Sequence, residues 1–325
     1  MSKTNFFSLF IVFFFCCTNA VSQKFKKEKI EIERFLNQTV TDFNATKYDK
    51  ALESSKQALI NSFAINDPSL IAQSYNSIGV VYNECNDAKR AIGFYEKALF
   101  YAKKANNDKL FNWVYGNLGS AYYFSQIDVP KGIGYYKKAL YYAEKIKDST
   151  EIIYTRVNIA SAYYAINNFA EGNKYVSKIK DNVLANGSQD SKMSMNLLMG
   201  IYTTHQENKS EAERYYTTAE KIALENDFDS YLINIYENRI LHHKHFNEPE
   251  IANRYKEKYD SCNKVVYSKD KLDNLNEGAL NIELDEYKMQ LERVEQVNLN
   301  HKRNLLESEL IVFLFIVILI ILLLL

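Results

Sequence analysis

Small and aromatic residues alternate with polar stretches in a fixed repeat along most of this 325-residue chain. A small residue returns every 40 or 41 positions, at Ala51, Ala91, Gly132, Gly172, Ala212 and Ala252. An aromatic residue lies three positions after most of them, at Phe94, Tyr135, Tyr175, Tyr215 and Tyr255. Such a period is typical of a solenoid, in which each unit buries its apolar face against its neighbours. The pattern therefore predicts stacked units and favours binding over catalysis.

A second motif precedes these positions and combines an aliphatic residue, a small residue, two spacers and a tyrosine. It occurs as Ile78-Gly79-x-x-Tyr82, Leu118-Gly119-x-x-Tyr122, Ile159-Ala160-x-x-Tyr163 and, more loosely, Leu198-Met199-x-x-Tyr202. Small residues let two helices approach closely, and the larger side chains beside them fill the grooves. This pattern predicts closely packed helix pairs.

The order of these positions resembles the tetratricopeptide repeat (TPR), a helix-turn-helix unit. The resemblance covers residues 31–268 and implies an all-α solenoid of about six helical hairpins, which we place in residues 23–268. The terminal units are atypical, with Arg239-Ile240-x-x-His243 in the last, as expected for units that cap a stack. The period exceeds the roughly 34 residues usual for the family, which predicts longer helices or connections.

Local signals agree with helical hairpins. Ser210 and Glu213 fit a capping box, and Pro130 and Pro249 stand where second helices would begin. Residues 106–108 and 186–188 are rich in Asn, Asp, Gly and Ser, which predicts turns between units. No segment alternates in the manner of a β-strand.

The first 22 residues are typical of a secretory signal peptide. One basic residue, Lys3, precedes a run from Phe6 to Cys17 that is apolar except for Ser8. Small residues then follow, with Ala20 and Ser22 as candidate cleavage positions. The alternative is a membrane anchor.

Residues 310–325 are apolar without interruption and predict a transmembrane helix. At about 1.5 Å per residue this helix would span roughly 24 Å, less than the roughly 30 Å hydrocarbon core. No Lys or Arg follows to mark a cytoplasmic flank. We therefore expect the sequence to stop inside its transmembrane helix, the alternative being a complete protein with a short terminal anchor.

Residues 269–309 are predicted to form a linker and a coiled-coil stalk. Apolar residues within 280–305 alternate spacings of four and three, as in Leu280, Leu284, Tyr287, Leu291 and Val294. Charged residues surround this seam, so a parallel homodimer is one expectation. The alternative is a single amphipathic helix that packs on the last repeat.

The chemistry-bearing residues are few. Forty basic residues balance forty acidic ones, which gives no reason to expect a nucleic-acid partner within this chain. No phosphate-binding loop, nucleophile elbow or paired Cys motif is present, so we expect no enzymatic activity and no cofactor. His242 and His245 share a helical face, but no carboxylate lies at ligand spacing; the sequence favours a solvated turn and no metal.

The better candidates lie on the first helix of each hairpin, which lines the concave groove in the family that the chain resembles. By that resemblance, an asparagine before the small residue of the first motif clamps an extended peptide, and an amide can both donate to and accept from a peptide backbone. The corresponding candidates are Asn117, Asn158 and Asn238, with Asn76 and Asn196 one position earlier than the pattern requires. The aromatic candidates on the same predicted face are Trp113, Tyr123, Tyr154 and Tyr164. Ordinary packing within the repeats is the alternative for all nine.

The sequence thus predicts a protein- or peptide-binding TPR module that is exported and held by one membrane helix, with its C-terminus toward the cytoplasm. This arrangement resembles bacterial regulators in which a cytoplasmic helix-turn-helix or histidine kinase domain follows the membrane helix. The sensor part of such a regulator is one hypothesis. A membrane-anchored envelope scaffold without signalling is the other.

Overall fold

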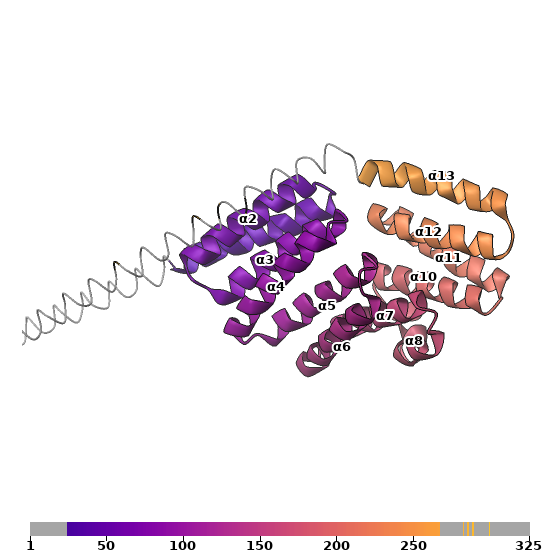
Figure 1. Cartoon of the computed structure of the whole chain (residues 1–325), viewed down its shortest axis with the longest axis horizontal. Helices are drawn as coiled ribbons and strands as arrows, with labels where there is room; N and C mark the ends of the chain where they lie inside the picture. Colours follow the sequence, from indigo (N-terminus) through magenta and orange to yellow (C-terminus); the bar gives the residue numbers. More distant parts are fainter. Residues whose placement is uncertain (1–24, 267–281, 283–284, 286–287, 289–298, 300–325) are drawn as a thin grey trace, which may run out of the picture. The chain divides into compact units, whose positions relative to one another are not determined.

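The computed structural model describes residues 25–266 and residues 282, 285, 288 and 299. It divides the chain into two units, with the boundary between Leu275 and Asn276. The described part of the first unit is a series of helices without a strand (Figure 1). The predicted all-α class is confirmed for this part of the chain.

Within residues 25–266 the helices pair into six antiparallel hairpins, as the repeat predicted. The first pairs residues 25–44 with α2 (Tyr48–Ala64). The others are α3 (Pro68–Glu84) with α4 (Ala88–Ala105), α5 (Asp108–Phe124) with α6 (Val129–Ile146), α7 (Ser149–Ala165) with α8 (Phe169–Val176) and α9 (Lys180–Asn186), α10 (Gln189–His205) with α11 (Lys209–Glu225), and α12 (Asp229–His245) with α13 (Pro249–Val266).

The long period follows from helices of 17 or 18 residues joined by short, regular connections. After α3, the N–H groups of Asn86 and Asp87 bond to the carbonyls of Asn83 and Tyr82, which closes the helix end. The Asp87 side chain then accepts from Arg90 N and caps α4. Three residues therefore end one helix and begin the next.

This connection requires a left-handed backbone conformation that L-residues other than Asn and Asp seldom adopt. Within residues 25–266, ten non-glycine residues have it, each one or two positions after a helix: Thr46, Asn66, Asn86, Asn106, Gln126, Lys147, Asn167, Glu207, Asp227 and Asn247. They return about every half period. Asn106 belongs to the turn predicted at residues 106–108. The turn predicted at residues 186–188 also separates two helices, α9 and α10.

The helix starts agree with the sequence in part. Pro130 lies in the first turn of α6 and Pro249 begins α13, as predicted. The capping box at Ser210 is wrong, because Asn208 caps α11 by accepting from Glu211 N at 3.3 Å. Glu213 instead directs its carboxylate toward α12, where Arg239 Nη2 donates to its Oε2 at 2.7 Å.

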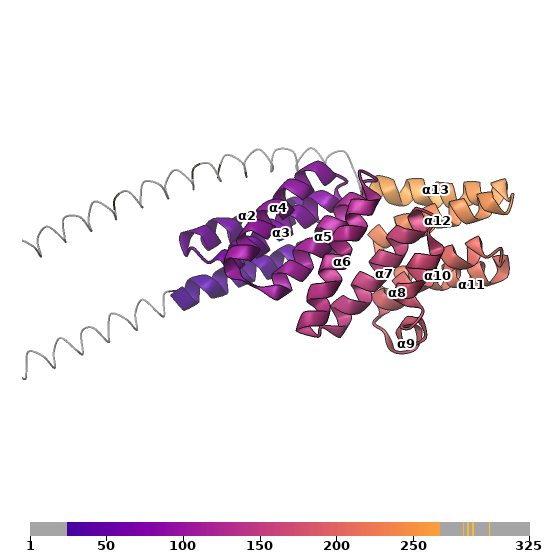
Figure 2. The ribbon, with the colours of Figure 1, turned by 60° about the horizontal axis from the view of Figure 1, so that its bottom comes forward.

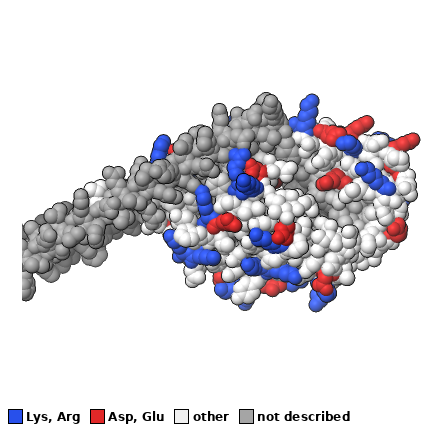
Figure 3. Space-filling view, viewed as in Figure 1, with Lys and Arg blue, Asp and Glu red and all other residues white. Residues whose placement is uncertain are grey.

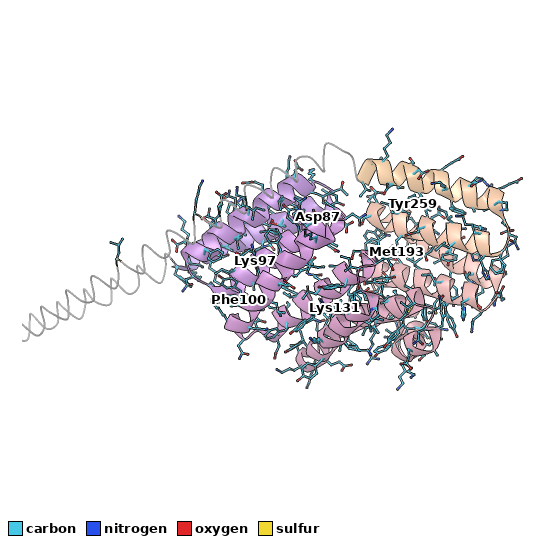
Figure 4. The ribbon with its side chains drawn as sticks, viewed as in Figure 1. Asp87, Lys97, Phe100, Lys131, Met193 and Tyr259 are labelled. Carbon is cyan, nitrogen blue, oxygen red and sulfur yellow. The ribbon has the colours of Figure 1, made fainter. Side chains whose placement is uncertain are left out.

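In the second, third and fourth hairpins the two sequence motifs meet. The Tyr82 ring stacks on Phe94 with centroids 5.5 Å apart, and the pairs Tyr122–Tyr135 and Tyr163–Tyr175 stack similarly at 5.6 and 6.1 Å. In the last hairpin His243 takes the tyrosine's place and stacks on Tyr255 at 5.3 Å. Lysines cover several of these pairs, such as Lys97 near Phe94 and Lys131 over Tyr122. Figure 4 labels both lysines.

The motif glycines provide space for a second set of buried tyrosines that the sequence motifs did not include. A Cβ added at Gly79, Gly119 or Gly200 would lie 2.5 to 2.7 Å from a ring atom of Tyr95, Tyr136 or Tyr216. Gly200 therefore holds the small position of the fourth motif, which the sequence assigned to Met199. The predicted register was wrong by one residue in that unit.

The fourth hairpin departs from the regular pattern. Its second helix is divided into α8 and α9, and Gly172, which marks the repeat, packs against the Tyr164 ring as well as against Ala160 of the preceding motif. Val176 of α8 and Val183 of α9 both pack into the same core cluster as Leu198 of α10. Farther along the chain, Met193 of α10 and Tyr259 of α13 pack in the core that joins α10 to the last hairpin (Figure 4).

The first helices of successive hairpins contact one another, α3 with α5, α5 with α7, α7 with α10 and α10 with α12. Figure 2 shows the hairpins following one another in chain order. The first helices thus form one continuous face, and the candidate residues of the predicted groove lie on these helices.

Several predictions lie outside the described residues. These are the signal peptide at 1–22, the transmembrane helix at 310–325 and, apart from isolated positions, the stalk within 269–309. Among the helices that the structure describes, none combines the length and apolar character needed to cross a membrane.

Candidate functional site

Two cavities open along the face of the first helices. The larger has a volume of about 630 Å³ and is lined mainly by α5, α7, α10 and α12. The smaller, of about 200 Å³, lies among α3, α5 and α7. Asn158 lines both cavities. The predicted concave groove therefore corresponds to hollow surface on the described helices.

The smaller cavity gathers five of the nine predicted residues: Asn76, Trp113, Asn117, Tyr154 and Asn158. Asn117 Nδ2 donates to Asn76 Oδ1 at 2.9 Å, so the amides of neighbouring hairpins form a row. This bond uses a donor of Asn117 and the acceptor of Asn76. The carbonyl oxygen of Asn117 and the N–H groups of Asn76 are the atoms suited to a peptide backbone.

A glutamate that sequence reasoning missed also lines the smaller cavity. Trp113 Nε1 donates to Glu151 Oε1 at 3.1 Å, while Lys109 Nζ lies 4.7 Å from the centre of the Trp113 ring. Burial raises the pKa of Glu151 above its ordinary value, and the Trp113 hydrogen bond opposes that shift. The indole is thus held at the cavity wall between a carboxylate and an ammonium group.

The larger cavity contains three further predicted residues, Tyr123, Tyr164 and Asn238, in addition to Asn158. The Asn238 amide donates to Asn234 O at 2.8 Å within α12. Tyr164 is only 3% exposed; its ring packs on Phe169, and its hydroxyl donates to Asn173. Tyr164 therefore supports the wall of the cavity more than it offers contact area.

Asn196 lies outside both cavities. It is 6% exposed, and its Nδ2 donates to the Lys192 carbonyl at 2.7 Å in its own helix. The shifted register explains this position, because Leu198, two residues before Gly200, stands where Asn117 and Asn158 stand relative to their small residues. Two positions rotate a side chain by about 200° around a helix, which turns Asn196 toward the core.

The rim of the larger cavity carries three large, exposed apolar side chains, which the sequence did not reveal. Phe124, Tyr231 and Leu241 are 53, 45 and 59% exposed and all line it. The repeat contained a usable signal, since Ser161, Ile201 and Leu241 are lining residues separated by 40 positions. Counting one period back from Tyr164 would have found Phe124, and counting in periods from Ser161 would have found Leu241.

The two ends of the groove also contact each other. Glu84, the last residue of α3, lies close enough to Ser230, in the first turn of α12, for the hydroxyl to act on its carboxyl group. Burial raises the pKa of Glu84, and the Ser230 hydroxyl partly opposes the shift.

The histidine segment is not the solvated turn that the sequence favoured. His242 and His243 are 0 and 2% exposed and lie in α12, while the side chain of His245 is 43% exposed. Glu213, from the preceding hairpin, supplies the carboxylate that the local spacing lacked: its Oε1 lies 3.4 Å from His242 Nε2 and 3.1 Å from His243 Nε2. The interpretation failed because the turn begins only after His245.

Charge does not single out a surface. Lys, Arg, Asp and Glu side chains are interspersed over the described part of the face in Figure 3, in keeping with the balanced composition. The expectation that no nucleic acid binds here stays a prediction, as do the expected lack of enzymatic activity and of a cofactor.

Comparisons with known proteins place the fold. No protein-family model matches the chain, and no curated protein matches its sequence. Among solved structures, the apo form of RapI is similar with a TM-score of 0.61 and 13% identity, over 72% of this chain and 83% of that one.

Two other similar structures are informative. The Rap conjugation gene regulator of the plasmid pLS20, in complex with the Phr* peptide, has a TM-score of 0.55 and 16% identity over 81% of this chain and 77% of that one. A STAND signal-transduction ATPase with a tetratricopeptide repeat sensor, from Pyrococcus horikoshii, has a TM-score of 0.52 and 13% identity over 83% of this chain and 44% of that one. The described helices of this chain therefore have a TPR-like fold.

Proposed function

We propose that this chain binds an extended peptide, or an extended segment of a protein, along the face of its first helices. The observation that carries the proposal is the amide row: Asn76, Asn117 and Asn158 stand on successive first helices and line one cavity. Their side chains combine donors and acceptors, which matches the alternating N–H and C=O groups of an extended backbone.

The neighbouring surface suits the side chains of such a ligand. Trp113 and Tyr154 border the amide row, and Phe124, Tyr231 and Leu241 are large apolar side chains on the rim of the adjoining cavity. Apolar contacts beside a few fixed polar groups are usual in ligand sites. The similar Rap regulator, whose structure contains the Phr* peptide, supports the proposal by its fold.

We extend the proposal to the place of the module in the cell. The signal peptide at 1–22 and the apolar run at 310–325 would export the repeats and anchor them by one helix. The module would then be the sensor of a membrane signalling regulator. Reading the coding sequence beyond residue 325 tests this: an in-frame DNA-binding or kinase domain supports it, and a stop codon favours the scaffold.

The binding proposal is tested with a library of random peptides displayed on phage, selected against the full chain in mild detergent. The affinity of an enriched peptide is then measured by fluorescence anisotropy. The double variant Asn117→Ala/Asn158→Ala should bind about 30-fold more weakly, since each lost hydrogen bond is worth about 1 kcal/mol and about 1.4 kcal/mol is tenfold.

Asn253→Ala provides the matched control, because Asn253 is exposed on α13, a second helix. It should leave the affinity unchanged. Equal affinity for the wild-type chain and a folded double variant would reject the amide row as the binding element.

A further inference from the structure

Glu213, His242 and His243 form a cluster between the fifth and sixth hairpins, with both histidines buried and the Glu213 side chain 28% exposed. Both imidazoles come from the last turn of α12, and the carboxylate comes from α11. One ligand-type atom from each lies within 4.8 Å of the others. Sequence spacing could not reveal the cluster, because about 30 residues separate Glu213 from the histidines.

The outer nitrogens of both rings have assigned partners. His243 Nδ1 lies 3.0 Å from Glu248 Oε2, and an ionised carboxylate can only accept, so Nδ1 carries the proton. His242 Nδ1 lies 2.7 Å from Thr204 Oγ1, whose single hydrogen is donated to Gly200 O at 2.8 Å. The hydroxyl therefore accepts from His242 Nδ1 as well. From these hydrogen bonds we assign the same tautomer to both rings, with the proton on Nδ1.

In a neutral imidazole of that tautomer, Nε2 carries a lone pair and no proton, so it can only accept a hydrogen bond or bind a metal ion. Both Nε2 atoms are buried and make no hydrogen bond with any part of the chain that the structure describes. They nevertheless lie 3.4 and 3.1 Å from Glu213 Oε1. With both rings neutral, three acceptor atoms converge with no donor among them, an arrangement that costs free energy unless a proton or a metal ion lies between them.

Two of the three separations among the ligand atoms are close to those around a metal ion, and the two Nε2 atoms lie within 4.8 Å of each other. Zinc binds His nitrogen and Glu oxygen at about 2.0–2.2 Å, so tetrahedral ligands stand roughly 3.3–3.6 Å apart. The two N–O separations are close to this range. Lone pairs that converge on a common point do not point at each other, which explains why 3.1 Å between His243 Nε2 and Glu213 Oε1 makes no hydrogen bond.

We propose that Glu213 Oε1, His242 Nε2 and His243 Nε2 bind a zinc ion. Imidazole nitrogen with one carboxylate oxygen is a donor set that suits zinc. Three protein ligands leave one tetrahedral position for water or a further group.

The surroundings fix these ligands from outside. Glu248 orients His243, and Lys209 in turn donates to Glu248, which is the carboxylate–histidine pairing common behind metal ligands. Arg239 holds the other oxygen, Glu213 Oε2, at 2.7 Å and also bonds Glu220 Oε2 at 2.9 Å. Glu213 Oε1 is thereby directed at the histidines. A bound ion would join α11 to α12 beside the larger cavity, which His242 lines.

The test uses the full chain without a histidine tag, in mild detergent, after removal of metal by a chelator. Co²⁺ is titrated as a coloured substitute for zinc, and visible absorption is recorded. We expect the intense bands of four-coordinate Co²⁺ to saturate at one ion per chain and to disappear when Zn²⁺ displaces it. A wild-type chain without these bands would overturn the proposal.

Variants locate the site. His242→Asn, His243→Asn and Glu213→Gln should each abolish the bands at stoichiometric Co²⁺. Glu248→Gln should weaken binding about 10- to 100-fold, as expected for a partner behind a ligand. His245→Asn is the matched control, because His245 is exposed on the same helix and pairs with Glu207; it should bind like the wild type. Bands that survive Glu213→Gln and His243→Asn, or that His245→Asn removes, would assign the ion to the surface instead and overturn the proposal. Circular dichroism confirms that each variant is folded.

Discussion

Replacing Gly119 by alanine tests whether the motif glycines serve close helix packing. The new Cβ would lie 2.5, 2.7 and 2.8 Å from three ring atoms of Tyr136, about 0.9 Å inside ordinary contact for the shortest pair. Tyr136 is fully buried, and its hydroxyl is 3.0 Å from Ser120 Oγ, so the ring has little room to move. Overpacking of this kind costs about 1–3 kcal/mol. The overlap with three atoms places the cost near the upper end.

Alanine also favours the helix over glycine by about 1 kcal/mol. The net expectation is therefore a destabilisation of about 2 kcal/mol, or a fall in Tm of about 4–8 °C for a domain of this size. Gly134→Ala provides the control, because nothing lies within 4 Å of a Cβ added there. It carries the same helix gain without a clash and should raise Tm by about 2–4 °C.

The assay is thermal unfolding of both variants followed by circular dichroism under the same conditions. The difference between the two variants isolates the packing contribution, at about 3 kcal/mol. If Gly119→Ala is as stable as Gly134→Ala, the contact with Tyr136 does not determine why glycine stands in the motif.

Three further expectations concern other parts of the chain. The Tyr136 hydroxyl has a hydrogen-bond partner and that of Tyr95 is buried without one among the described residues; Tyr136→Phe should cost about 1 kcal/mol in urea unfolding, whereas Tyr95→Phe should be neutral or stabilising. Because burial raises the pKa of Glu151 above 4.5, this carboxyl favours the folded state below its ordinary pKa, and that stability is lost as the pH rises through the raised value. Glu151→Gln, which can still accept the indole N–H, should therefore raise Tm at pH 7 and remove this part of the pH profile; an unchanged profile would contradict the assignment. Residues 23–308 should sediment as a dimer that weakens when Leu284 and Leu291 become Ser, and a monomer at high concentration would refute the stalk.

The sequence predicted the repeat, the hairpins and half of the groove because these depend on local and periodic information. A spacing of 40 or 41 residues places Asn117 and Asn158 at equivalent positions of neighbouring first helices, so one cavity gathers them together with Trp113 and Tyr154. The same logic failed at Asn196, where choosing Met199 over Gly200 as the small residue shifted the register by one. Periodicity locates a face only when its phase is correct.

The sequence by itself determined that the described chain folds into helical hairpins with a TPR-like repeat, since turn residues, helix starts and small positions act within a few neighbouring residues. Only the tertiary structure decided which tyrosines the glycines accommodate, where the second helix of the fourth hairpin divides, and that His242 and His243 meet Glu213. These outcomes depend on how closely and at what angle helices pack. That geometry is set by many side chains together, and no spacing along the sequence records it.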